Sequence, residues 1–356
     1  RGFDMFWIIG ADSLVEAMKT MSENPFTSFI AGQLTHKEWE GFAFEDLIFP
    51  LFVFMAGVSL VFSLEKMVAQ EGRAAAVGRV IRRGVLLWVI GVFYYDWFKD
   101  VTPGLRFMGV LQRIALSSMF AGLIFCYFKK RGIAVICAGL LILYWALMVF
   151  VPVPGLGAGH FEKGANLANY VDEHFLPGYK WEGKWDPEGL LSTIPAIASC
   201  LLGVLAGFLM KNNAVAPMRK VGILLGAGAA GVALGFLWGL EFPVIKKIWT
   251  SSYVLVAGGF SAMLLAAFYL VIDVWHKQEW CVPFVWIGLN PLTIYLFEKL
   301  VNYEKVSSRF LGGDIKAFFN AQVTQGFGNF LVACGGLVIA FAFARFLHTR
   351  RLYLRL

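Results

Sequence analysis

The chain has 356 residues, of which 58% are hydrophobic and only 15% are charged, and its mean hydropathy is +0.67. A soluble domain carries roughly one quarter charged residues, so this composition excludes an ordinary soluble protein. The net charge of +7 does not indicate nucleic-acid binding, because the lysines and arginines lie in short segments between apolar runs.

Apolar runs of about 20 residues, each long enough to cross a hydrocarbon core of roughly 30 Å, recur along the whole chain. Within lipid the backbone must satisfy its own hydrogen bonds, which favours α-helices. The sequence therefore predicts an all-α polytopic membrane bundle of about ten transmembrane helices. The expected spans are residues 2–21, 45–65, 80–98, 107–128, 132–151, 190–210, 219–239, 250–273, 282–302 and 325–348.

Basic residues gather in alternate connections and predict the orientation of the bundle. They follow the second, fourth and sixth spans and recur in the C-terminal tail, so these segments are expected to be cytoplasmic. The opposite side then carries His36 and the longest connection, about residues 152–189, which holds six acids against three lysines. We expect a single transmembrane domain over residues 1–356 with this extracytoplasmic loop.

The stretch LTHKEWEGFAFEDLIFPLFVFMAGVSL, residues 34–60, joins a polar loop to an apolar helix. His36 is its side chain most easily tuned to exchange protons near neutral pH. Glu45 and Asp46 offer carboxylates to hold the imidazole in one tautomer, and Trp39 is suited to shield the site or stack on a sugar. The alternatives are a surface histidine and two acids that cap the second span.

Two polar residues inside expected spans are further candidates. Asp12 lies in an apolar segment, where a carboxylate is costly and favours a functional cavity; alternatively, this segment frays into water. Asn290 precedes Pro291 and indicates a broken helix that lines a cavity, or an interhelical hydrogen bond without a chemical role.

Four arginines are candidates for anion binding. Arg113, within GVLQRIALSS, needs either a carboxylate from another helix or a ligand phosphate. Arg79, Arg82 and Arg83 lie near the expected cytoplasmic boundary, where anionic lipid head groups or an anionic cofactor would suit them.

Other common site signatures are missing from the sequence. It has no Walker loop, dinucleotide fingerprint, HExxH or GxSxG motif, and its five cysteines lack the paired spacing of a zinc site, so we expect no metal. The residues alone also fit a transporter or flippase for a sugar-linked substrate.

Six blocks occur in order between Arg1 and about Leu300. They are RGFDMFWIIGAD, THKEWEGFAFEDLIFPLFVFMAGVS, RVIRRGVLLWVIGV, LRFMGVLQRIAL, PVIKKIWTSSYVL and WIGLNPLTIYLFEKL. Together they resemble the heparan-α-glucosaminide N-acetyltransferase family, most closely its bacterial branch, which lacks the luminal domain of the animal enzyme. The resemblance implies an integral protein of a bacterial inner membrane, with His36 facing outward.

This resemblance also implies an activity and a set of site residues. The family moves acetyl from cytosolic acetyl-CoA to the amine of a terminal glucosamine across the membrane. Its H-x-x-W-x-G segment before D-L-x-F-P falls on His36, Trp39, Gly41 and Asp46, so His36 is the expected base or nucleophile. Asp12 departs from an asparagine of the animal enzyme and is its expected partner.

The remaining roles combine this resemblance with the reasoning from the residues above. We expect Asn290 to stabilise the oxyanion, acetyl-CoA to bind Arg113, Arg79, Arg82 and Arg83, and the acceptor to bind Trp39, Glu45 and Asp46. The expected partners are acetyl-CoA, an amino-sugar glycan and membrane lipids, with no nucleic acid, and a homodimer through the lipid face is a further hypothesis. An O-acyltransferase of an envelope polysaccharide is an alternative that differs in its acceptor.

Overall fold

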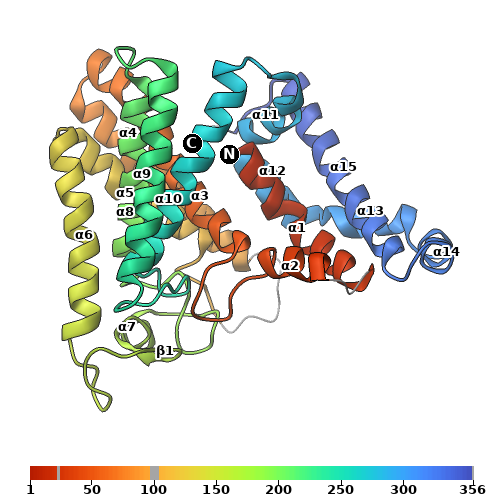
Figure 1. The fold of residues 1–356 in the computed structure, drawn as a ribbon, viewed down its shortest axis with the longest axis horizontal. Coiled ribbons are helices and arrows are strands. Elements are labelled where there is room, and N and C mark those ends of the chain that lie inside the picture. The colour runs from red at the N-terminus through yellow and green to blue at the C-terminus, as the bar shows by residue number, and fades with distance from the viewer. Residues whose placement is uncertain (22–24, 97–103, 355–356) are drawn as a thin grey trace. The chain divides into compact units, whose positions relative to one another are not determined.

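The computed structural model describes residues 1–21, 25–96 and 104–354 (Figure 1). Helices dominate it, and one short antiparallel hairpin pairs β1 (Phe161–Glu162) with β2 (Ala165–Asn166). The α-helices are α1 (Gly2–Met21), α2 (Pro25–Gln33), α3 (Phe44–Gln70), α4 (Arg73–Asp96), α5 (Val110–Tyr127), α6 (Lys130–Phe150), α7 (Leu167–Phe175), α8 (Thr193–Lys211), α9 (Pro217–Trp238), α10 (Ser251–Tyr269), α11 (Val282–Leu289), α12 (Pro291–Val301), α13 (Tyr303–Leu311), α14 (Asp314–Gln322) and α15 (Phe327–Thr349). A π-helical turn (Leu270–Val274) and a 3₁₀ turn (Glu279–Cys281) complete the described elements.

The predicted all-α polytopic membrane bundle is confirmed. Among the described residues, seven helices are long and apolar enough to cross a membrane: α3, α5, α6, α8, α9, α15 and α10 extended to Val274. An eighth span results if the segments Glu279–Leu289 and Pro291–Val301, bent by 74°, count as one. The chain is therefore an integral membrane protein.

The count of ten spans is not confirmed. The expected spans 2–21 and 80–98 fall on α1 and on α4, which are helical but carry more charge than the other spans. Asp4, Asp12, Glu16 and Lys19 interrupt α1, and four arginines lie in the first half of α4. Both helices form as expected, but their charge keeps them out of the set of seven helices that are apolar enough to cross a membrane.

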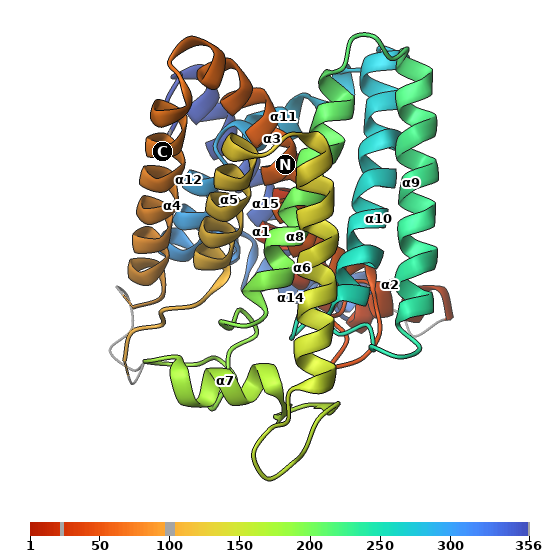
Figure 2. The same ribbon diagram turned by 90° about the vertical axis from the view of Figure 1, so that its left-hand side faces the viewer.

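The chain divides into two compact units. Unit 1 contains Arg1–Lys37, Ala43–Ile48 and Val271–Arg355, and unit 2 contains Glu38–Phe42 and Phe49–Leu270. Within unit 1, α1 packs against α2, α11, α12 and α15, and α15 also packs against α13 and α14. Within unit 2, α5 packs against α4 and α8, α8 against α6 and α10, and α10 lies beside α9 (Figure 2).

Two glycines let α3 and α8 approach each other closely in unit 2. A Cβ atom on Gly57 would lie 1.9 Å from the backbone oxygen of Cys200, and one on Gly203 would lie 1.9 Å from that of Phe54. No side chain fits between these backbones, which is the packing that small residues permit in membrane helices.

Unit 2 has two chemically different ends. One end, the loop end, carries the segment 152–189, in which α7 lies across the ends of the long helices (Figure 2). There Tyr144, Met148, Leu167, Phe242 and Ile248 form part of a buried cluster. The other end, the basic end, carries the turns that join α3 to α4, α5 to α6 and α8 to α9.

Candidate active site

His36 and Asp46 lie against each other in unit 1. The imidazole Nδ1 lies 3.1 Å from Asp46 Oδ1. The His36 side chain is 55% exposed, whereas that of Asp46 is 0% exposed. The two residues come together because His36 lies in the loop that leads from α2 into α3, and Asp46 belongs to the first turn of α3.

Asp46 also caps the helix that it helps to begin. Its Oδ2 accepts the backbone N–H of Ala43 at 3.1 Å and that of Lys37 at 3.3 Å. A side chain in the first turn that reaches back to the N–H before the helix is the geometry of a capping box, and a carboxylate is favoured at this positive end. The sequence left capping and a site role as alternatives, and the structure gives Asp46 both the cap and the contact with His36.

An exposed imidazole backed by a buried carboxylate is suited to proton transfer. When the Nδ1–H group donates a hydrogen bond to Asp46, the neutral ring of His36 carries its basic lone pair on Nε2. The carboxylate also stabilises the positive charge that the ring gains when Nε2 takes a proton. Asp46 thus has the geometry for the partner role that the sequence analysis gave to Asp12.

Two acids of α1, Asp12 and Asp4, are relevant to the site around His36. Asp12 lies in α1, but its side chain falls outside the described residues, so its partnership with His36 stays a prediction. Asp4 was not among the predicted site residues: it is 1% exposed, and its carboxyl oxygens have no hydrogen-bond partner among the described residues. Its charge interacts with that of the buried Glu45. The sequence feature that marks Asp4 as a candidate is an acid within an apolar run.

Asn290 lies at a break in the helix, which is one of the two alternatives that the sequence left open. It lies between α11 and α12, where the two segments bend by 74°. Its Nδ2 donates to the backbone oxygen of Leu352 at 2.9 Å, and its Oδ1 accepts the N–H of Leu354 at 3.3 Å. Asn290 therefore holds the C-terminal segment in place, and its oxyanion role stays a prediction.

Trp39 belongs to unit 2 and packs against the loop end. Its Nε1 donates to the backbone oxygen of Phe161 at 2.9 Å, and its ring lies edge-on to Trp185 with centroids 5.7 Å apart. Gly41 donates its N–H to the backbone oxygen of Val244 at 2.9 Å. These contacts fix the segment 38–42 within unit 2, and a sugar-stacking role of Trp39 stays a prediction.

Arg113 is fully buried near the start of α5, at the loop end. Its Nη2 donates to the backbone oxygens of Pro187 and Gly189 at 3.3 and 3.2 Å, and to Ser192 Oγ at 2.5 Å. The guanidinium also lies 4.9 Å from the centre of the Trp249 ring. Its Nε and Nη1 have no hydrogen-bond partner among the described residues. Arg113 therefore holds the end of the segment 152–189 against the bundle.

The other three candidate arginines do not cluster with Arg113. The antiparallel pairing of α4 and α5 places Gly84 against Met119, and Gly91 against Gln112. Arg113 follows Gln112 and so lies opposite the part of α4 near Gly91. This part of α4 is about eight residues from Arg83, which is roughly 12 Å along the helix axis. Arg79 and Arg82 are exposed and Arg83 is half-buried. The structure separates the cofactor candidates into a group of three toward the basic end and Arg113 at the loop end.

A buried ionic network fixes the segment 152–189. Arg106 donates to both carboxyl oxygens of Asp186 at 2.9 and 2.7 Å, and to Glu188 Oε2 at 2.7 Å. Asp172 Oδ1 accepts the N–H of Leu190 at 2.8 Å. Burial raises the pKa of Asp172 to about 6. Burial and the neighbouring charge of Asp186 raise the pKa of Glu188 to about 7, against the opposing effect of Arg106.

These raised pKa values predict that the loop end is more stable at mildly acidic pH. Asp172 and Glu188 bind protons more tightly in the folded protein than in the unfolded chain, so stability falls as the pH rises toward about 6 and about 7. We expect hydrogen exchange, corrected for its intrinsic pH dependence, to show stronger protection of residues 161–192 at pH 5.5 than at pH 7.5. The variant Asp172→Asn, which cannot ionise, should lessen the difference. Equal or weaker protection at the lower pH would contradict the prediction.

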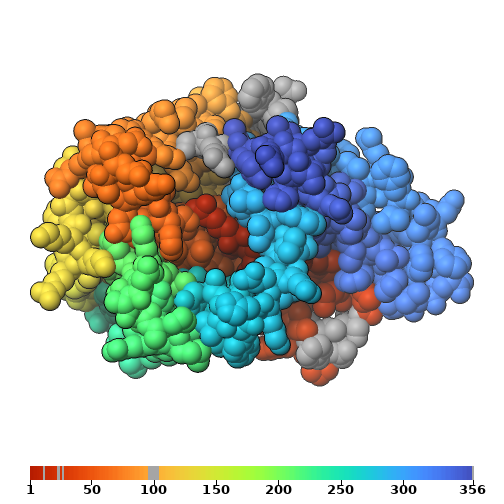
Figure 3. Space-filling view, turned by 90° about the horizontal axis from the view of Figure 1, so that it is seen from above, coloured from red at the N-terminus to blue at the C-terminus, as the bar shows by residue number. Residues whose placement is uncertain are grey.

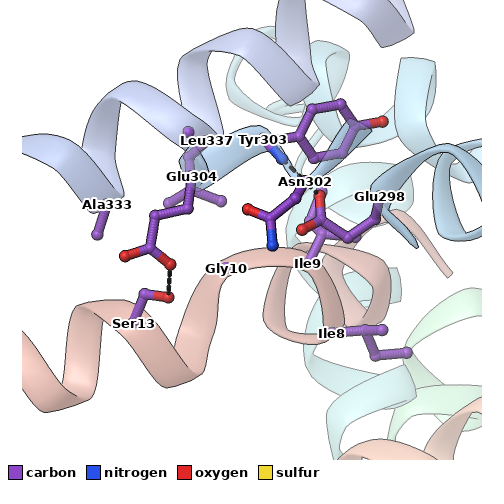
Figure 4. A pocket seen from close by; sticks show the side chains of 11 residues that line it. Ile8, Ile9, Gly10, Ser13, Glu298, Asn302, Tyr303, Glu304, Ala333 and Leu337 are labelled. Atoms are coloured by element: carbon purple, nitrogen blue, oxygen red, sulfur yellow. Dashed lines mark hydrogen bonds between the residues drawn. The ribbon is translucent and has the colours of Figure 1, made fainter. Parts of the chain in front are cut away.

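A pocket of about 220 Å³ lies within unit 1 between α1, α12, α13 and α15 (Figure 4). Its polar groups come from Ser13, Glu298, Asn302 and Glu304, and Ser13 Oγ donates to Glu304. Apolar residues supply much of the remaining lining. An acidic lining of this kind suits a positively charged group better than an anion.

Within the described ranges, no group of three or more His, Cys, Asp or Glu side chains is arranged to hold a metal ion. Among the described residues, the His36–Asp46 pair has the geometry suited to proton transfer.

The comparisons with known proteins point to one family. Residues 19–170, which include His36, Asp46 and Arg113, match the model described as "Heparan-alpha-glucosaminide N-acetyltransferase, catalytic". The protein named heparan-alpha-glucosaminide N-acetyltransferase from Mus musculus is 28% identical over 334 residues, covering 75% of this chain and 49% of that protein. Its namesake from Homo sapiens is 29% identical over 334 residues with the same coverage. The chain spans about half the length of these curated relatives. These matches confirm the resemblance that the sequence motifs indicate.

Proposed function

We propose that this chain, a relative of the heparan-alpha-glucosaminide N-acetyltransferases, is a membrane-embedded acetyltransferase that transfers acetyl from acetyl-CoA to the amine of a terminal glucosamine. The observation that carries the proposal is the His36–Asp46 pair. It combines an exposed imidazole with a fully buried carboxylate at 3.1 Å, and it lies in the segment that the family model covers.

The proposed chemistry begins with the acceptor amine. A sugar ammonium group is not nucleophilic, so a base must remove its proton before or during attack. One proton of the ammonium group is first released to solvent, and Nε2 of His36 then takes a second proton from the amine nitrogen as this nitrogen bonds to the thioester carbon. The carbon–sulfur bond then breaks, and the coenzyme A thiolate receives the proton from the imidazolium. Asp46 holds the ring and stabilises its charge throughout.

A covalent route uses the same two residues. In this route Nε2 attacks the thioester carbon itself, coenzyme A leaves, and the amine then takes the acetyl group from the imidazole. A burst of free coenzyme A before steady-state product formation would identify this route, whereas direct transfer releases coenzyme A and product together.

The proposed orientation follows from the two ends of unit 2. The basic end, with Lys129, Lys130 and Arg131 in one turn, faces the cytoplasm under the positive-inside rule. The loop end and the acceptor lie on the extracytoplasmic side of a bacterial inner membrane. Arg79, Arg82 and Arg83 lie toward the basic end, where they would meet the phosphates of acetyl-CoA that enters from the cytoplasm.

The experiment that tests the proposed function is acetyl transfer by the purified protein. Radiolabelled acetyl-CoA is supplied with an oligosaccharide ending in glucosamine, and with a matched one ending in glucose. We expect N-acetylated product from the first only, and none from the variant His36→Gln. Product from the glucose-ended sugar would instead indicate an O-acyltransferase. Failure to bind acetyl-CoA, together with counterflow of a sugar-linked substrate, would favour a transporter.

A further inference from the structure

The basic end of unit 2 contains an open groove of about 810 Å³ between α3, α5, α6 and α8. Phe125, Phe208 and Val68 supply an apolar wall, and Lys129, Lys130 and Arg131 line the groove beside it. We propose that this groove binds an anionic phospholipid, with its phosphate at the three cations and an acyl chain along the apolar wall. The proposal is independent of acetyl transfer.

The ends of the candidate spans beside the groove put it at the expected depth of lipid head groups. Three of its helices are candidate spans that end or begin beside it: α5 ends at Tyr127, α6 begins at Lys130 and α8 ends at Lys211. The side chains of Tyr127 and Phe128 are 59% and 50% exposed, as is typical of aromatic residues at a membrane interface. Figure 3 views this end, with the turn after α3 in orange and the start of α6 in yellow on the same face.

The electrostatics of the groove favour a phosphate. Lys129, Lys130 and Arg131 are consecutive and exposed. Glu65 is the one acidic residue among the described lining residues, and Lys211 pairs with it at 3.0 Å. The three cations also lie at the N-terminus of α6. Lys129 provides no side-chain cap there, and this end of the helix dipole is positive.

The apolar wall favours a lipid over a soluble anion. Phe125 and Phe208 stack with ring centroids 5.5 Å apart, and Lys130 Nζ lies 4.9 Å from the centre of the Phe208 ring. A cation is therefore held directly beside an aromatic surface. Free phosphate would contact the cations but leave this surface in water, whereas a phospholipid covers both.

Native mass spectrometry of the full chain in detergent can test the proposal. We would titrate the protein with phosphatidylglycerol, and with phosphatidylcholine of the same acyl chains. The test variant is the triple change Lys129→Gln, Lys130→Gln and Arg131→Gln. The matched control removes three exposed cations elsewhere by Lys277→Gln, Lys305→Gln and Arg309→Gln.

We expect the test variant to bind phosphatidylglycerol roughly 10- to 100-fold more weakly than wild type, with phosphatidylcholine binding unchanged. The control variant should bind like wild type. Equal binding by wild type and test variant would overturn the proposal. So would displacement of the lipid by acetyl-CoA or inorganic phosphate at equal concentration, because the groove would then be a site for a soluble anion. If the triple variant folds poorly, the single variant Lys130→Glu tests the same site, and it should also weaken phosphatidylglycerol binding.

Discussion

Replacing Asp46 with asparagine is expected to lower kcat for acetyl transfer by roughly 100- to 10,000-fold, close to the effect of His36→Gln. The asparagine oxygen can still accept the N–H groups of Ala43 and Lys37, so the helix cap is retained. Its amide nitrogen then faces Nδ1 of His36, which must accept a hydrogen bond. The neutral ring therefore carries its proton on Nε2, and the base is lost from the position where the acceptor needs it.

The measurement is kcat and KM for acetyl-CoA and for the amine acceptor, beside the thermal unfolding temperature of each variant. A role in orienting His36 predicts a loss in kcat with little change in KM or in unfolding temperature. Asp46→Ala removes both the cap and the partner, so it should lower the unfolding temperature as well as kcat. If Asp46→Asn keeps wild-type kcat, Asp46 is a helix cap alone, and the base has another partner.

Replacing Gly57 with alanine is expected to destabilise the folded protein by about 1–3 kcal/mol or more. The new Cβ would lie 1.9 Å from the backbone oxygen of Cys200 and 2.9 Å from the backbone nitrogen of Val204. Neither atom belongs to a side chain that can rotate away, so α3 and α8 must separate. We would measure the unfolding temperature and the yield of monodisperse protein in detergent.

Gly139→Ala is the matched control for this change. Gly139 also lies within a membrane helix, α6, but a Cβ there would meet no atom within 4 Å. Alanine has the higher helix propensity, so this control should be neutral or slightly stabilising. If both variants unfold at the wild-type temperature, the close approach of α3 and α8 is not required for the fold.

Sequence alone identified the architecture of the membrane bundle, because uninterrupted apolar runs in lipid can satisfy their backbone only as helices. Seven expected spans correspond to apolar helices, and the break at Asn290 follows from the proline after it. The motif around His36 also indicated the resemblance to the N-acetyltransferase family that the match over residues 19–170 supports. Hydropathy alone does not decide the expected spans at α1 and α4, because charge within a helix lowers its hydropathy whether it faces lipid, protein or water.

Tertiary structure alone decided which groups meet. Local pattern could not choose between capping and a site role for Asp46, since one carboxylate has enough acceptor positions for the cap and for His36. Nor could it place Arg113 against Gly189 and Ser192, because that contact joins segments more than 70 positions apart. Burial and hydrogen bonding between distant segments are properties of the packed chain, so the sequence determined the membrane helices and the candidate base, and the fold determined their partners.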